Sequence, residues 1–93
     1  MAPVSERQAL IRLQNILFTR ALQARDYEGA ERSALRRALL DPEDHRPWLD
    51  VAAAREKQGA LTGAMQALSR ARSLGEPIAA CDARLDRVRM RLN

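Results

Sequence analysis

The chain contains few aromatic residues, a single cysteine and no long apolar run. Aromatic side chains make up 3% of its 93 residues, and the one cysteine is Cys81. A single cysteine cannot form an internal disulfide, which fits a reducing compartment. No apolar stretch reaches about 18 residues, and no charged-then-apolar leader opens the chain. We therefore expect a cytoplasmic protein that neither crosses nor binds a membrane.

Residues that could act in catalysis or bind a metal ion are equally scarce. Cys81 and the one histidine, His45, form a candidate nucleophile and base, but no third group is identifiable that would orient them. Two such residues are also too few for a zinc site. The acidic loop of Asp41, Glu43 and Asp44 lacks the further ligands and the central glycine of a calcium loop. We expect no catalytic residue, cofactor or metal ion, and interpret Cys81 as a small buried hydrophobe.

The formal net charge of +4 suggests one alternative, a nucleic-acid-binding domain, because clustered cations displace counterions from a phosphate backbone. Fifteen of the sixteen basic residues are arginines, and acidic residues stand between them. The densest run, Arg84, Arg87, Arg89 and Arg91, is interleaved with two aspartates and has no aromatic residue nearby to stack on a base. A solvated helix face is the favoured interpretation, and nucleic acid is an unlikely partner.

Alanine and leucine carry most of the 46% hydrophobic content and predict an all-α fold of five helices. The first helix runs from an N-cap at Ser5 to about Ala24, and its core face is a stripe of Leu10, Leu13, Leu17 and Ala21. The second runs from Tyr27 to near Leu40 with an inward face of Ala30, Ala34 and Ala38.

Glycine and proline delimit the other three helices. The third begins at a cap on Asp44, with Pro47 in its first turn, and stops at Gly59. The fourth opens at Ala60 or Leu61 and closes at Leu74, before Gly75. The fifth starts at Pro77 and has a single apolar stripe with polar residues on its other faces: Ile78, Cys81, Leu85, Val88 and Leu92. That pattern predicts a helix that caps the end of a stack.

The chain nearly repeats itself after thirty-four residues. Gly29-Ala30 returns as Gly63-Ala64, Arg36 as Arg70, Leu40 as Leu74 and Leu17 as Val51. Thirty-four residues is the tetratricopeptide period. A helical hairpin of that length cannot bury its apolar face alone, so the units must stack and leave a groove or an end free. The repeat therefore predicts a binding protein rather than an enzyme.

The second unit resembles a tetratricopeptide repeat in its opening tryptophan, its turn glycine and its packing positions: Trp48, Val51, Ala52, Gly59, Leu61, Ala64, Leu68, Ala71 and Leu74. The first unit matches more loosely, at Leu17, Tyr27, Ala30 and Pro42, and places Gln14, Phe18 and Arg25 where the pattern has the tryptophan, a small residue and the turn glycine. The resemblance implies one domain over 1–93, a short right-handed solenoid. Repeat 1 covers about 10–42, repeat 2 about 44–75 and the capping helix about 77–92.

Most of the chain also resembles the C-terminal tetratricopeptide segment of bacterial SirB-type transglutaminase-like proteins. The similar parts are Pro3-Val4-Ser5-Glu6-Arg7, the stretch from Leu10 to Ile16 and the arginine-rich end from Arg84 to Asn93. This resemblance implies an alternative in which the chain is the accessory end of an enzyme or regulator, with a transglutaminase-like domain upstream. No residue here matches that domain's catalytic cysteine, histidine and aspartate, so no catalytic role is transferred.

In such repeats the first helix of each unit lines the concave surface. The resemblance therefore implies a candidate groove of Arg12, Asn15, Thr19, Leu22 and Gln23 from the first helix and Arg46, Leu49, Ala53, Glu56 and Lys57 from the third. Its mixture of amide, cationic and aliphatic groups suits a peptide or a helix from a partner protein. An unused, solvated groove is the alternative.

The first helix is apolar in nearly every direction around its axis. Besides the core stripe it carries a candidate docking face of Ile11, Ile16, Phe18 and Leu22. A helix of this kind needs cover on more than one side, and an uncovered apolar patch usually marks a protein interface. We expect this face to contact an upstream domain or a second copy of the chain.

Overall fold

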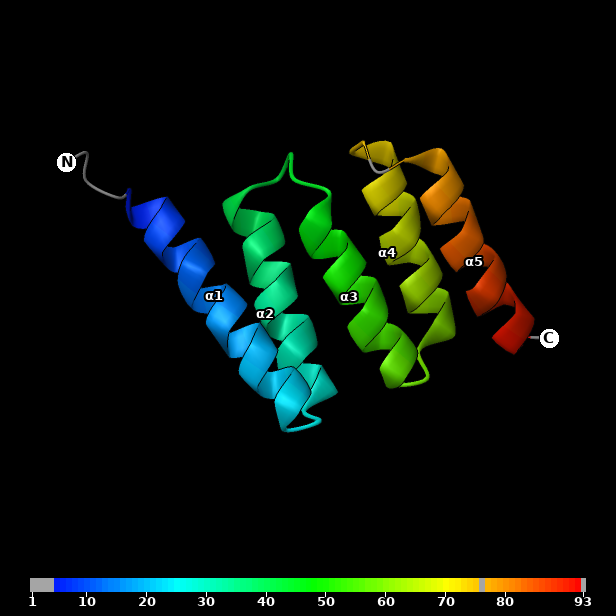
Figure 1. Ribbon diagram of the computed structural model, residues 1–93, viewed down its shortest axis with the longest axis horizontal. Coiled ribbons are helices and arrows are strands. Elements are labelled where there is room, and N and C mark those ends of the chain that lie inside the picture. Colours follow the sequence, from blue (N-terminus) through cyan, green and yellow to red (C-terminus); the bar gives the residue numbers. More distant parts are fainter. Residues whose placement is uncertain (1–4, 76, 93) are drawn as a thin grey trace.

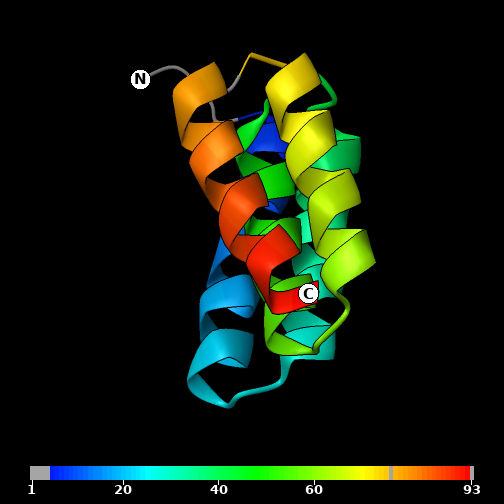
Figure 2. The ribbon, with the colours of Figure 1, turned by 90° about the vertical axis from the view of Figure 1, so that its right-hand side faces the viewer.

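In the described part of the chain, five helices, each packed against its neighbour in sequence, form an elongated layer of 52 × 30 × 16 Å (Figures 1 and 2). The computed structural model describes residues 5–75 and 77–92, and the side chains of all of these except 78–80. The helices are α1 (Glu6–Gln23), α2 (Tyr27–Leu40), α3 (Arg46–Lys57), α4 (Leu61–Ser73) and α5 (Ile78–Leu92). Consecutive helices are antiparallel, as Figure 1 shows. The all-α prediction with five helices is confirmed.

Helix ends follow local sequence signals. The Ser5 hydroxyl accepts a hydrogen bond from the Gln8 amide at 3.1 Å, which confirms Ser5 as the N-cap of α1. Asp26 caps α2 in the same way, through the Gly29 amide at 3.0 Å. The cap predicted at Asp44 differs in detail, because the residue before α3 is His45. The Asp44 carboxylate still accepts from the first helical amide, that of Arg46, at 2.9 Å.

The turns that close the two hairpins are equivalent after thirty-four residues. In the first turn the amides of Ala24, Arg25 and Asp26 donate to the carbonyls of residues 20, 22 and 21. In the second, the amides of Gln58, Gly59 and Ala60 donate to the carbonyls of residues 54, 56 and 55. Arg25 and Gly59 both have positive φ, 58° and 80°. The first turn thus reproduces the second although arginine replaces the glycine that this backbone favours.

The core lies where α2, α3, α4 and α5 meet. It comprises Ala34, Val51, Ala52, Ala64, Ala67, Leu68, Leu85 and Val88, with Phe18 and Trp48 packed against it. Alanines at the helix contacts let the backbones approach closely, which is why so few large side chains suffice. Of the predicted apolar stripe of α5, Cys81, Leu85 and Val88 are buried, while Leu92 is 48% exposed. Ile78 lies outside the described side chains.

The repeat positions fall into three groups. Six are buried: Ala30, Val51, Ala52, Ala64, Leu68 and Ala71. Four are half-buried, Leu17, Tyr27, Trp48 and Leu74, while Gly59 and Pro42 are exposed in turns. Trp48 packs against the core but is only half-buried, because it borders a surface hollow of about 350 Å³ that Leu39 and Pro42 also line.

The predicted core face of α1 is wrong for two of its four residues. Leu10 and Leu13 are 46% and 47% exposed, and the most buried residue of the helix is Gln14, at 8%. The half-buried Ile11 and Phe18 lie on the same side as Gln14, toward α2. Helix α1 stands at the end of the layer and packs against one neighbour, so only one of its apolar flanks is covered. Periodicity alone could not choose between those flanks.

The predicted docking face of α1 needs a matching correction. Phe18 packs against the core and Ile11 is half-buried, so neither is free for a partner. Ile16 and Leu22 are 45% and 38% exposed, but six residues of helix place them on different sides of the axis. The four residues do not form one surface.

Replacing Gln14 with leucine is expected to stabilise the fold. The Gln14 Oε1 atom is buried and accepts no hydrogen bond from the described residues. Burying an unsatisfied polar atom costs about 1–3 kcal/mol, and leucine has nearly the same volume. We expect Gln14→Leu to raise the free energy of unfolding by about 1 kcal/mol in urea titrations. The matched control is Gln8→Leu, at an exposed position of the same helix, which should change it by less than about 0.5 kcal/mol. A destabilised Gln14→Leu would contradict this account.

Candidate binding groove between α3 and α5

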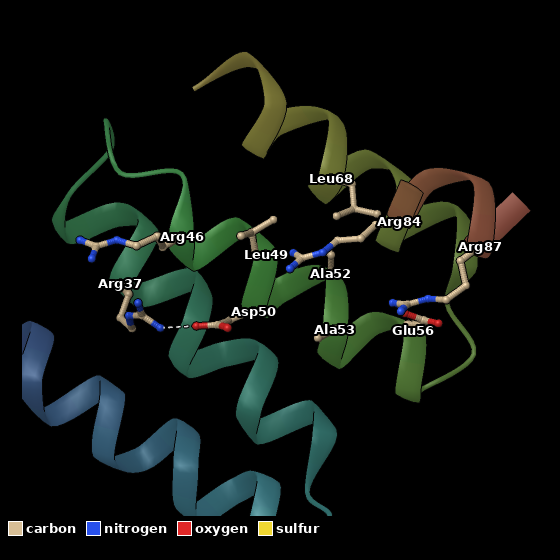
Figure 3. Close-up of a pocket in the computed structure, with 10 residues that line it drawn as sticks. All are labelled: Arg37, Arg46, Leu49, Asp50, Ala52, Ala53, Glu56, Leu68, Arg84 and Arg87. Atoms are coloured by element: carbon tan, nitrogen blue, oxygen red, sulfur yellow. Dashed lines mark hydrogen bonds and ion pairs between the residues drawn. The ribbon is translucent and has the colours of Figure 1, made fainter. Parts of the chain in front are cut away.

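A groove with a volume of about 520 Å³ lies on the α3 side of the layer, bounded by α5 (Figure 3). Its floor is apolar and consists of Leu49, Ala52 and Ala53 of α3 with Leu68 of α4. Its charged lining consists of Arg37, Arg46, Asp50, Glu56, Arg84 and Arg87. Four cationic and two anionic groups therefore surround an apolar floor.

Both acidic side chains of the groove are already engaged. Glu56 pairs with Arg87 at 3.1 Å and with Arg91 at 3.2 Å, and these contacts join α5 to α3. Asp50 pairs with Arg37 of α2. The carboxylates therefore hold the walls of the groove together and leave it with excess positive charge.

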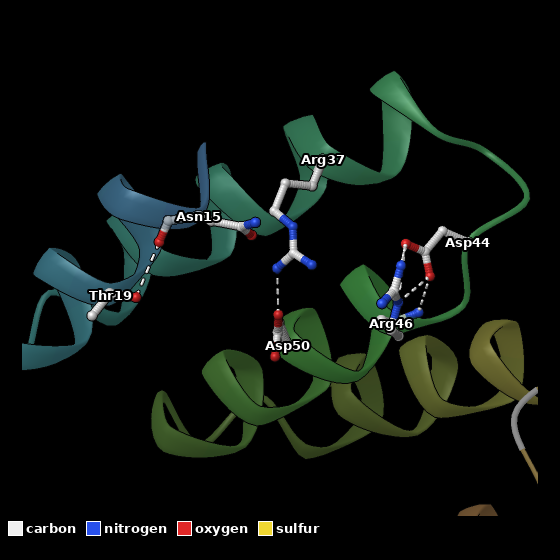
Figure 4. Close-up of polar contacts among 6 residues, drawn as sticks. All are labelled: Asn15, Thr19, Arg37, Asp44, Arg46 and Asp50. Carbon is white, nitrogen blue, oxygen red and sulfur yellow. Dashed lines mark hydrogen bonds and ion pairs between the residues drawn. The ribbon is translucent and has the colours of Figure 1, made fainter. Parts of the chain in front are cut away.

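Arg46 is compensated by its neighbour in sequence. Its Nε and Nη2 donate to the Asp44 carboxylate at 2.9 Å each, as Figure 4 shows. This hydrogen bond lowers the pKa of Asp44 below its ordinary value of 3.8 and outweighs a partial desolvation that acts in the other direction. Because Asp44 stays ionised at neutral pH, a partner's carboxylate must compete with it for Arg46.

Arg84 differs from the other three arginines of the groove, because it has no ion-pair partner among the described residues. Its guanidinium reaches over the groove floor between Leu49 and Ala52 (Figure 3). Across residues 5–75 and 77–92 it takes part in no hydrogen bond or ion pair, although the residue is half-buried. A guanidinium held over apolar surface without a counter-charge can bind a carboxylate through two parallel hydrogen bonds. It is the strongest candidate binding group in the groove.

The predicted groove residues divide between separate hollows. Arg46, Leu49, Ala53 and Glu56 line the groove described above, and Lys57 lines a smaller hollow beside it together with Arg87 and Arg91. Arg12, Asn15, Thr19 and Gln23 line a different, shallow hollow on α1, and Leu22 lies outside it. The Thr19 hydroxyl donates to the backbone carbonyl of Asn15 at 3.0 Å, so it is engaged within its own helix (Figure 4). One continuous groove across α1 and α3 is not present in the described part of the chain.

The features that suggested chemistry have structural roles or stay apart from the groove. The Cys81 side chain is fully buried, and its Sγ lies 3.7 Å from the Leu68 carbonyl oxygen, as expected for a small hydrophobe with a weak donor.

Among the described residues no group of three or more histidine, cysteine or acidic side chains could hold a metal ion. Similarly, no helix in the described ranges has the length and apolarity needed to span a bilayer.

Six residues that line the groove were not predicted as groove residues: Arg37, Asp50, Ala52, Leu68, Arg84 and Arg87. Arg37 belongs to α2, which packs against α3. Arg84 belongs to α5, which the ion pairs of Glu56 join to α3. Asp50 lies next to the predicted Leu49, but its ion pair with Arg37 joins residues thirteen positions apart. Helical spacing shows which residues share a face of one helix, and it gives no signal for residues on other helices that pack beside that face.

No protein-family model matches the chain, and no curated protein matches it. The resemblances to tetratricopeptide repeats and to SirB-type transglutaminase-like proteins therefore stay predictions from the sequence.

Proposed function

We propose that this chain is a non-catalytic, tetratricopeptide-like interaction module that binds an acidic segment of a partner protein in the groove between α3 and α5. The observation that carries the proposal is the guanidinium of Arg84, which lies over an apolar floor and has no ion-pair partner among the described residues. The equivalent hydrogen-bonded turns at residues 24–26 and 58–60 support two like hairpins of the repeat kind.

The groove selects for two properties in a partner. Leu49, Ala53 and Leu68 offer apolar contact to a small aliphatic side chain. Arg84 offers a fork of donors to a carboxylate on the same segment. An amphipathic helix or an extended peptide with an aliphatic residue next to aspartate or glutamate satisfies both requirements.

The chemistry of the surface favours protein over nucleic acid. Among the described residues, seven arginines of α2 to α5 are engaged in ion pairs: Arg37, Arg46, Arg55, Arg72, Arg87, Arg89 and Arg91. A phosphate backbone would have to break several of these pairs to collect the charge that nucleic-acid binding needs. A single carboxylate needs only Arg84.

Binding of a model peptide tests the proposal. The probe is an amphipathic peptide of about 15 residues built from leucine, alanine and glutamate, and its counterpart has glutamine in place of glutamate. We expect the acidic peptide to shift the NMR amide signals of Leu49, Ala53 and Arg84. Arg84→Glu should weaken its binding about tenfold or more, because an attractive contact becomes repulsive. The glutamine peptide should bind weakly to both proteins.

Arg89→Glu is the matched control, since it makes the same charge change on α5 at an exposed residue that pairs with Asp86 at 3.7 Å and does not line the groove. It should reduce affinity by less than about threefold. Equal losses in the two variants would show that net charge, not the groove, attracts the peptide. A duplex DNA that binds more tightly than the peptide, and whose affinity falls steeply with salt, would favour the nucleic-acid alternative.

A further inference from the structure

One flank of α1 presents apolar residues to solvent. Leu10, Leu13 and Ile16 are 46%, 47% and 45% exposed. Helical spacing places Leu13 in the middle of this flank, with Leu10 nearer the buried Gln14 and Ile16 on the opposite edge. We call this flank the outer face of α1. It lies at the free end of the layer, where no further described helix packs against it (Figure 1).

Two charged residues lie on the outer face, one at each end. Glu6 precedes Leu13 by seven residues and Arg20 follows it by seven, which is two helical turns in each direction. Both side chains are exposed, and within the described ranges neither takes part in an ion pair. The outer face is therefore apolar in the middle, negative at its N-terminal end and positive at its C-terminal end.

We propose that the outer face of α1 binds the outer face of α1 in a second copy of the chain, with the two helices antiparallel and the two-fold axis at Leu13. In this register Leu13 meets Leu13 of the second copy, and Leu10 of one copy and Ile16 of the other flank that contact on its two sides. Glu6 of each copy then lies opposite Arg20 of the other. One symmetric arrangement thus covers the outer face and compensates all four of these charges.

The antiparallel direction follows from the charges. A parallel pair would place Glu6 against Glu6 and Arg20 against Arg20, and like charges at facing positions repel. The residues at alternating spacings of three and four, namely Glu6, Ala9, Leu13, Ile16 and Arg20, also keep a seven-residue repeat, which allows two helices to stay in contact over the length of α1.

The dimer is independent of the proposed function. The groove between α3 and α5 is lined by residues of α2, α3, α4 and α5, and no residue of α1 lines it. A dimer through α1 leaves both grooves open and presents two of them to a partner with repeated acidic segments. Failure of peptide binding and failure of dimerisation are separate results.

Sedimentation equilibrium of the full chain tests the proposal. One helix from each copy buries less than a standard interface, so we expect reversible dimers with a dissociation constant on the order of 10–100 μM. Leu13→Glu should give a monomer at all concentrations up to about 1 mM, because the new carboxylate would meet itself on the two-fold axis. Circular dichroism should show an unchanged helix content, since Leu13 is 47% exposed and outside the core.

Leu39→Glu is the matched control, because Leu39 is the most exposed large apolar residue, at 80%, and belongs to α2. It should leave the dissociation constant within about threefold of the parent value. A parent chain that stays monomeric to about 1 mM overturns the proposal, as does a dimer that Leu39→Glu abolishes and Leu13→Glu does not.

Charge reversal tests the register. Glu6→Arg and Arg20→Glu should each weaken the dimer about tenfold, because each creates two repulsive pairs. The double variant should return to within about threefold of the parent affinity, and an equimolar mixture of the two single variants should form heterodimers. If the double variant is as weak as the single ones, the antiparallel register is wrong.

Discussion

The variant Val88→Asp is expected to be unfolded at 25 °C. Val88 is fully buried in the core cluster with Val51, Ala52 and Leu68. Folding would place a carboxylate among these apolar side chains with no partner, at a cost of more than about 4 kcal/mol. A domain of this size is stabilised by only about 5–10 kcal/mol, and its small alanine-rich core puts it at the lower end. Loss of the helical circular dichroism signal and of the cooperative thermal transition is the measurement.

Met90→Asp provides the comparison, two residues further along α5. Met90 is 78% exposed, so the same acidic side chain at that position stays in water and should change the free energy of unfolding by less than about 0.5 kcal/mol. Comparing Val88→Asp with Met90→Asp tests whether α5 is part of the stabilising core. A folded Val88→Asp with native thermal stability would show that α5 is dispensable and that the remaining four helices are stable alone.

Trp48→Ala is expected to lower the free energy of unfolding by about 3 kcal/mol, the lower end of the range for large aromatic residues. The indole packs against the core, but the residue is only half-buried, so part of its surface is already in contact with water. Removing it would enlarge the hollow of about 350 Å³ between α2 and the start of α3 and leave Leu35 and Ala38 poorly packed. Urea unfolding followed by circular dichroism measures the change, since the variant has no tryptophan fluorescence.

Leu39→Ala is the appropriate control for Trp48→Ala, because Leu39 lines the same hollow but is 80% exposed. It should cost less than about 0.5 kcal/mol. Equal losses in the two variants would indicate that the hollow is closed in solution and that Leu39 packs into it. A loss below about 1 kcal/mol for Trp48→Ala would show that its repeat position carries little of the stability.

The helices and their turns could be predicted from the sequence because their signals are local. Ser5 caps α1 through an amide three residues away, and Gly59 forms the turn between α3 and α4 with a φ of 80°. The thirty-four-residue period also holds where the residue type changes, since Arg25 adopts the same left-handed backbone as Gly59. At this turn, the hydrogen bonds of the hairpin outweigh the preference of arginine for a negative φ.

The covered side of α1 and most of the groove could not be predicted in the same way. Leu10 and Gln14 are both compatible with a face turned to a core, and burial of the glutamine depends on how α2 lies against α1. Arg84 reaches Leu49 across thirty-five residues of sequence because α5 returns beside α3. Contacts between helices depend on which of several apolar faces pack together, and that choice is made by the whole set of helices at once.

The amino-acid sequence by itself determined that this protein is helical, where each helix begins and ends to within about one turn, and that the turn after α1 has an equivalent after α3. These properties depend on hydrogen bonds and backbone angles within a few residues. Only the tertiary structure decided that Gln14 is buried while Leu13 faces solvent, and that Arg84 lies over an apolar floor with no ion-pair partner among the described residues. Burial and charge compensation are properties of neighbours in space, and those neighbours exist only once the helices have packed.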